Sequence, residues 1–88
     1  MPRVIITHNV VDLQRWLEGK AERAAAISAL GTNVVDTVAL DGSNKIAVTA
    51  DVNDLAALEA MLTSPAPELA ALMEKHGVIP PFTTYVEK

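Results

Sequence analysis

The 88-residue sequence contains no cysteine, so no disulfide can stabilise it. That absence fits a reducing compartment. No apolar stretch approaches the roughly 18 residues that a membrane-spanning helix needs. The apolar run that follows Met1, Pro2 and Arg3 is far too short for the core of a signal peptide. We therefore expect a cytoplasmic protein with no membrane partner.

Aromatic and basic residues are also scarce. The only aromatic side chains besides histidine are those of Trp16, Phe82 and Tyr85, and the seven Lys and Arg residues are scattered in a chain of net charge −4. A nucleic-acid-binding protein needs a basic face, or aromatics interleaved with basic residues. The composition therefore argues against a nucleic-acid partner.

Metal and phosphate motifs are missing as well. The sequence has no HxH, CxxC or HExxH motif, no paired carboxylates and no glycine-rich phosphate loop. These arrangements supply most dedicated metal and nucleotide sites. We expect no metal and no cofactor.

Apolar residues are plentiful: they form 50% of the chain, and the mean hydropathy is +0.25. Residues 1–88 fit one domain, which at this size buries only about 60–65% of its unfolded surface. An apolar-rich small domain without disulfides is most simply explained by a surface buried against a partner. Symmetric dimers are the commonest such assembly, so we expect a homodimer.

The first half of the chain predicts a strand and a helix. Residues 3–11 alternate in an extended, β-branched pattern, which places His8 on one face with Val4, Ile6 and Val10. Asp12 is a good N-cap for a helix over residues 13–30 with apolar residues at helical spacing. In that helix we expect Arg23 to face water.

The second half predicts a hairpin, a broken helix and a last strand. Strands over residues 34–40 and 45–52 flank a tight turn. A helix follows that breaks at residues 64–67, where two prolines stand, and its second piece ends at His76. Residues 80–81 form a stiff proline connector before a strand over residues 82–87.

The resulting order is βαββαβ. Right-handed crossovers turn this order into an α+β, ferredoxin-like fold, with a four-stranded antiparallel sheet and the helices on one face. The bare face needs cover, and a second copy would complete a dimeric α/β barrel. We predict that this face forms the dimer interface.

The opening Thr7-His8-Asn9-Val10-Val11-Asp12, with Trp16 four residues on, resembles the His-x-Val-x-Asp-x-x-x-Trp opening of a small subgroup of the dimeric α/β-barrel superfamily. Residues 64–81 resemble its broken second helix and final strand. The resemblance covers nearly the whole chain and relates it to antibiotic-biosynthesis monooxygenases and polyketide cyclases. It implies cofactor-independent chemistry on an aromatic or polyketide-like molecule. Haem-degrading and quinone-forming relatives place their Trp elsewhere, so those constellations are incomplete here.

His8 is the strongest candidate for chemistry, because an imidazole titrates near neutral pH and can act as a general base. Asp12 is a candidate to orient it, although its role as a helix cap explains it equally well. The candidates for substrate contact are Trp16, Met61, Met73, His76 and Tyr85. Each also has an ordinary role: Trp16 and the methionines as core residues, and His76 as a cation at a helix C-terminus.

Two functions therefore remain open. One is a cofactor-independent cyclase or monooxygenase with His8 as base, in which Asp12 orients the imidazole. The other is a non-catalytic small-molecule-binding or structural dimer in which the same side chains stabilise the core.

Overall fold

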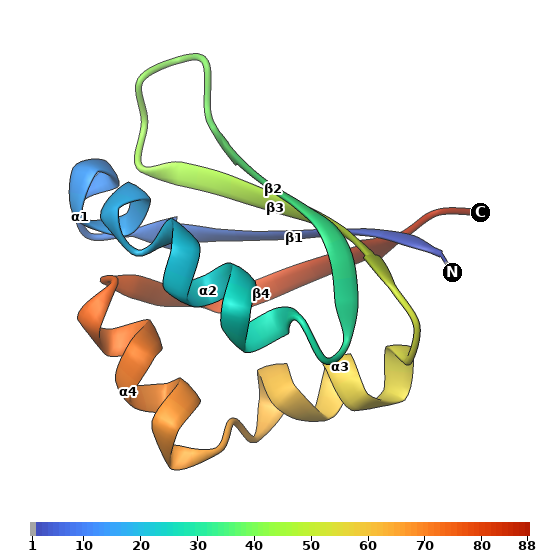
Figure 1. Cartoon of the computed structure of the whole chain (residues 1–88). Helices are drawn as coiled ribbons and strands as arrows, with labels where there is room; N and C mark the ends of the chain where they lie inside the picture. The colour runs from blue at the N-terminus through green and yellow to red at the C-terminus, as the bar shows by residue number, and fades with distance from the viewer. Residues whose placement is uncertain (1) are drawn as a thin grey trace.

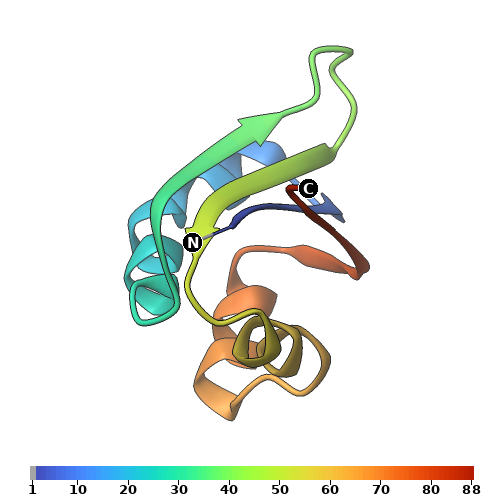
Figure 2. The same cartoon turned by 90° about the vertical axis from the view of Figure 1, so that its right-hand side faces the viewer.

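The computed structural model describes residues 2–88. Its sheet contains four antiparallel strands in the order β2-β3-β1-β4, and Figures 1 and 2 show the helices on one side of it. The strands are β1 (Arg3–Val10), β2 (Gly31–Val38), β3 (Lys45–Val52) and β4 (Val78–Val86). The predicted ferredoxin-like fold is confirmed.

The helical layer consists of two broken crossovers. The first holds α1 (Leu13–Glu18) and α2 (Lys20–Ile27), and the second holds α3 (Leu55–Thr63) and α4 (Pro67–Lys75). The predicted break in the second crossover is confirmed. The single helix expected over residues 13–30 is wrong, because the chain leaves helical hydrogen bonding at Gly19, and α2 ends at Ile27 rather than at residue 30.

Two strand boundaries also differ from the expectation. β2 begins at Gly31, three residues earlier than expected, because its backbone pairs with β3 from Val52 onward. β4 begins at Val78 and takes in the cis Pro80–Pro81 bond, which was expected to form a connector. The pairing of β4 with β1 shifts register between Thr7 and Asn9, opposite these prolines, so the strand continues past them as an irregularity.

The core lies between the sheet and the helices. β1 and β3 contribute alternate side chains, as a sheet covered on one face should. The buried apolar residues form one cluster around Val4, Ala50 and Leu58 and a second around Val10, Trp16 and Ile46.

Within residues 2–88, no helix covers the opposite face of the sheet (Figure 1). The strand registers align Tyr85, Ile5, Thr49 and Val35 in one row across that face. Ile5 is 38% exposed, Val35 48% and Tyr85 56%. The next row holds Thr83, Thr7, Ala47 and Thr37 and is more polar.

Candidate functional site

A small, partly open cavity of about 70 Å³ lies between the sheet and the helices. It brings together three of the residues singled out in the sequence, His8, Met61 and Met73, with Arg23 and Phe82. Among the described residues, His8 and Arg23 are the only ionisable side chains in its lining; the rest are apolar. A small apolar chamber with few polar groups is the usual form of a ligand site, although this one is far smaller than most.

His8 projects from β1 toward the helices, where strand alternation places it. Its ring makes edge-to-face contacts with Phe82 and Trp16, with centroids 5.2 Å and 6.2 Å away. Nδ1 lies 2.9 Å from the Asn9 carbonyl oxygen. Because a carbonyl only accepts, Nδ1 donates this hydrogen bond, and the lone pair of the neutral ring is on Nε2.

The surroundings of His8 favour that neutral ring. Burial lowers its pKa below the ordinary value; the hydrogen bond to Asn9 acts in the opposite direction, and the positive charge of Arg23 lowers the pKa further. Desolvation and a nearby like charge both disfavour an imidazolium. His8 is therefore in its proton-accepting form at neutral pH.

Asp12 caps α1. One of its carboxylate oxygens accepts a hydrogen bond from the backbone N–H of Arg15 at 3.1 Å. Within residues 2–88, no direct hydrogen bond joins this carboxylate to His8, which bonds Asn9 instead. The geometry of Asp12 is therefore that of a helix N-cap.

Trp16 is fully buried and lies under the guanidinium of Arg23, whose Cζ is 4.0 Å from the ring centroid. Such a cation–π contact strengthens when both groups are desolvated. Trp16 contacts His8 but does not line the cavity. Tyr85 lies on the uncovered face of the sheet, away from the cavity.

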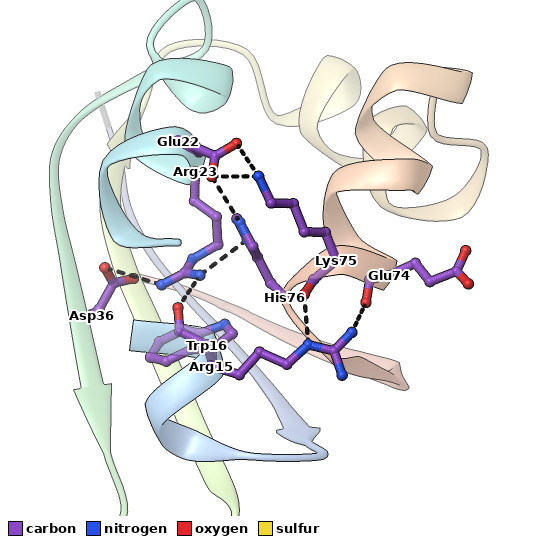
Figure 3. Close-up of polar contacts among 8 residues, drawn as sticks. All are labelled: Arg15, Trp16, Glu22, Arg23, Asp36, Glu74, Lys75 and His76. Atoms are coloured by element: carbon purple, nitrogen blue, oxygen red, sulfur yellow. Dashed lines mark hydrogen bonds and ion pairs between the residues drawn. The ribbon is translucent and has the colours of Figure 1, made fainter. Parts of the chain in front are cut away.

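His76 is 2% exposed, lies beside Arg23 (Figure 3) and does not line the cavity. Its Nδ1 accepts a hydrogen bond from Arg23 Nη1 at 3.2 Å, and its Nε2 is 3.7 Å from a carboxylate oxygen of Glu22. Burial and the charge of Arg23 lower the pKa of His76, whereas Glu22 raises it. The expectation of a protonated imidazole at this helix end is therefore wrong, because burial of the ring against Gly19 lowers its pKa.

Arg23 is the residue that sequence reasoning placed in water, and this was wrong. Its side chain is only 12% exposed and is paired with Asp36, which is 2% exposed, at 3.6 Å. Arg23 lies seven residues, about two helical turns, after Trp16, so a continuous helix already puts it on the side of that buried ring. The prediction that Arg23 faces water overlooked this spacing. The sequence signal that could have found it is Asp36, a carboxylate on the helix-facing side of a strand.

In the part of the chain that the structure describes, no group of three or more His, Cys, Asp or Glu side chains could hold a metal ion. No helix there is long and apolar enough to cross a membrane.

Solved structures share this fold. A provisionally named antibiotic biosynthesis monooxygenase from Bordetella bronchiseptica superposes with a TM-score of 0.68 at 8% identity, over 99% of this chain and 94% of that one. A similarly named protein from Deinococcus radiodurans gives 0.58 at 14% identity, over 97% and 90%. A protein from Agrobacterium tumefaciens gives 0.65 at 16% identity, over 100% and 92%. No family model and no curated protein matches the chain.

At these identities the structural neighbours show the fold alone. This chain therefore has the ferredoxin-like fold of proteins named as antibiotic biosynthesis monooxygenases. The residues that line its own cavity are therefore the basis for its chemistry.

Proposed function

We propose that this chain is a cytoplasmic, homodimeric, cofactor-independent enzyme that removes a proton from an aromatic or polyketide-like molecule, with His8 as general base. The observation that carries the proposal is a neutral, half-buried imidazole in an otherwise apolar cavity beside one cation. The names of the structural neighbours support a monooxygenase; a cyclase is the second reaction that the same base could begin.

Both reactions can begin with one step. His8 Nε2 takes a proton from an acidic O–H or C–H of the substrate, and the electron pair left behind is delocalised onto a substrate oxygen as a phenolate or enolate. In a cyclase the carbanion carbon forms a C–C bond to a carbonyl carbon of the same molecule, and the oxygen of that carbonyl takes the proton back from His8. In a monooxygenase the carbanion gives electrons to dioxygen, the co-reactant, and forms a C–O bond to a hydroperoxide that takes the proton from His8. The hydroperoxide then loses water and leaves a new carbonyl group on the product. An enolisable substrate supplies the charge delocalisation itself, so these steps draw on the side chains present.

The test is turnover of 1,3-dihydroxynaphthalene, an enolisable polyphenol, followed by oxygen uptake and by absorbance of the product. His8→Gln should keep the fold and lower turnover by about 10²-fold or more, since that is the usual contribution of a general base. A His8→Gln protein with unchanged turnover would rule out the base. A wild-type protein that binds the probe without turnover would favour the alternative, a non-catalytic small-molecule-binding dimer.

Asp12 is tested against a matched cap. Asp54 caps α3 as Asp12 caps α1, by accepting the N–H of Ala57 at 3.0 Å. Asp12→Ala and Asp54→Ala should each cost about 1 kcal/mol of stability. If Asp12 also orients His8, directly or through a water molecule, only its variant loses turnover in the folded fraction.

The dimer is proposed through the row of Ile5, Val35 and Tyr85 on the uncovered face of the sheet. Ile5→Lys should shift the sedimentation of the wild type from dimer to monomer at micromolar concentration, because a charge in an apolar interface core is costly. Leu17→Lys is the control, since Leu17 is 39% exposed, like Ile5 at 38%, but lies on a helix. A wild-type monomer in the same experiment overturns the dimer.

A further inference from the structure

The sheet is irregular beside His8, and the irregularity brings a phenylalanine against its ring. β1 and β4 pair in one register as far as Thr7, which lies opposite Thr83. One more step of that register places Phe82 opposite His8. The register then shifts before Asn9, so His8 and Phe82 face each other at the point where the regular pairing ends.

Pro81 explains why the pairing ends there. The backbone N–H of Glu87 donates to the carbonyl oxygen of Arg3, so the odd-numbered residues of β1 turn their backbone groups toward β4. Continued regular pairing would set Pro81 opposite the odd-numbered Asn9. Proline has no N–H to donate to that carbonyl, and the pairing resumes only at Ile79. The extra residues in β4 form a bulge, a feature that commonly re-aims side chains next to active sites.

The even-numbered position of His8 brings its side chain close to that of Phe82. The backbone groups of His8 point away from β4, and facing residues that exchange no hydrogen bonds have the closest side chains in an antiparallel pair. The two rings meet edge to face, with centroids 5.2 Å apart and planes at 78°. Trp16 makes a similar contact from α1 at 6.2 Å, but of these two aromatic rings only that of Phe82 also lines the cavity. Phe82 is therefore the aromatic neighbour of His8 on the side of the cavity.

The hydrogen bonding of His8 makes the orientation of its ring important. Nδ1 donates to the Asn9 carbonyl oxygen at 2.9 Å. Within residues 2–88, Nε2 has no hydrogen-bond partner, but unlike Nε2 of His76 it is not fully buried. A turn of the ring about its Cβ–Cγ bond would break the bond to Asn9 and move Nε2 away from its present direction. The packing of Phe82 against the imidazole opposes that turn.

We infer that Phe82 is a positioning residue for His8, whose ring it holds in the one orientation that leaves Nε2 free to take a proton from the substrate. The inference rests on the proposed function, because this orientation matters for turnover only if His8 is the base. The hydrogen bond that one nitrogen of a histidine makes determines which nitrogen carries the proton. By keeping Nδ1 on Asn9 and water away from the ring, Phe82 maintains a neutral, Nδ1-protonated imidazole.

The experiment is an NMR titration of His8 in the wild type and in Phe82→Leu, since ring carbon and nitrogen resonances report both the tautomer and the pKa. The wild type should show the Nδ1-protonated tautomer alone. Phe82→Leu keeps an apolar side chain but loses the aromatic ring, so both tautomers should appear. The midpoint of the titration should rise by roughly half a pH unit or more as water reaches the imidazole. Phe82→Met serves if the Leu variant does not fold, because methionine fills irregular gaps.

Leu58→Val is the matched control. Leu58 belongs to the core cluster against which Phe82 packs, but it does not line the cavity with His8. Its truncation loosens the same part of the core, so it should lower stability and leave the tautomer and the titration of His8 unchanged. His76 is an internal reference in each spectrum, because it does not line the cavity and is hydrogen-bonded to Arg23.

Turnover of 1,3-dihydroxynaphthalene links the positioning to catalysis. The pH at which kcat/KM falls to half on the acid side should rise in Phe82→Leu together with the titration midpoint of His8, since a base is lost when it is protonated. If His8→Gln keeps turnover while Phe82→Leu disturbs the tautomer, the base is wrong and the positioning by Phe82 stands. If Phe82→Leu leaves the His8 ring unchanged, or Leu58→Val disturbs it as much, the role of Phe82 is overturned, whatever the fate of the base.

Discussion

The two helical crossovers are both broken, but for different reasons. Between α3 and α4 the chain carries its own breaking signal: Pro67 disfavours a helical backbone at Ala66, which is extended, with φ −60° and ψ 153°. Between α1 and α2 the break is at Gly19, whose φ of −87° any residue could adopt. There another part of the chain requires the glycine, since the ring of His76 occupies the space where a Cβ would be. The second break is thus tied to local sequence, and the residue at the first break to a distant side chain.

The two breaks also differ in what surrounds them. The first lies over a polar cluster in which Arg23, Asp36 and His76 are buried together. The second is flanked by apolar helix faces, with Leu58 buried in the core and Met61 packed against it. Changes in side-chain size or in pH should therefore lower the stability of the protein through the first break and not through the second.

Gly19→Ala should have the largest effect. The added Cβ would overlap the His76 ring, while the backbone itself accepts alanine, so the clash is purely steric. We expect a loss of about 2–4 kcal/mol in the free energy of unfolding, measured by urea denaturation, as for severe overpacking. The double variant with His76→Ala should recover part of that loss. A Gly19→Ala protein as stable as the wild type would show that the break is not held open by His76.

Acidification should have the second-largest effect on stability, and it should act at the first break through His76. The folded-state pKa of His76 lies below its ordinary value, so below about pH 6.5 the unfolded chain binds the proton first. Stability is then fully present above about pH 6.5 and falls as the pH drops toward the folded-state pKa, by at most about 1.4 kcal/mol per pH unit for each such histidine.

His8 has a lowered pKa as well and contributes a slope of the same sign. His76→Gln should flatten the decline of the unfolding free energy between about pH 6.5 and pH 5 by one histidine's share, and His8→Gln by the other. If the unfolding free energy of the His76→Gln protein declined with pH as steeply as that of the wild type, the first break would not be a source of acid sensitivity.

Pro67→Ala should have the smallest effect. Pro67 is the first residue of α4, where its fixed φ is already suited to the helix. Its replacement mainly frees the unfolded chain, at a cost of roughly 0.5–1 kcal/mol. The same denaturation experiment measures it, and circular dichroism should show unchanged or slightly increased helix content. A loss as large as that of Gly19→Ala would erase the distinction between the two breaks.

Much of this protein followed from the sequence alone. Alternation along β1 placed Val4, Ile6, His8 and Val10 on one face, and the structure covers that face with helices. The prolines within residues 64–67 predicted the second break. These features depend on residues close together in the chain, where the period of a strand and the backbone limits of proline act directly.

The tertiary structure alone decided the first break and the cation in the cavity. Gly19 carries no local signal strong enough to end a helix, and it is the arrival of His76, from the far end of α4, that fills the space beside it. Arg23 lies against Asp36 and lines the cavity instead of facing water. Contacts between residues so far apart depend on how the crossovers pack on the sheet, and helical periodicity does not contain that information.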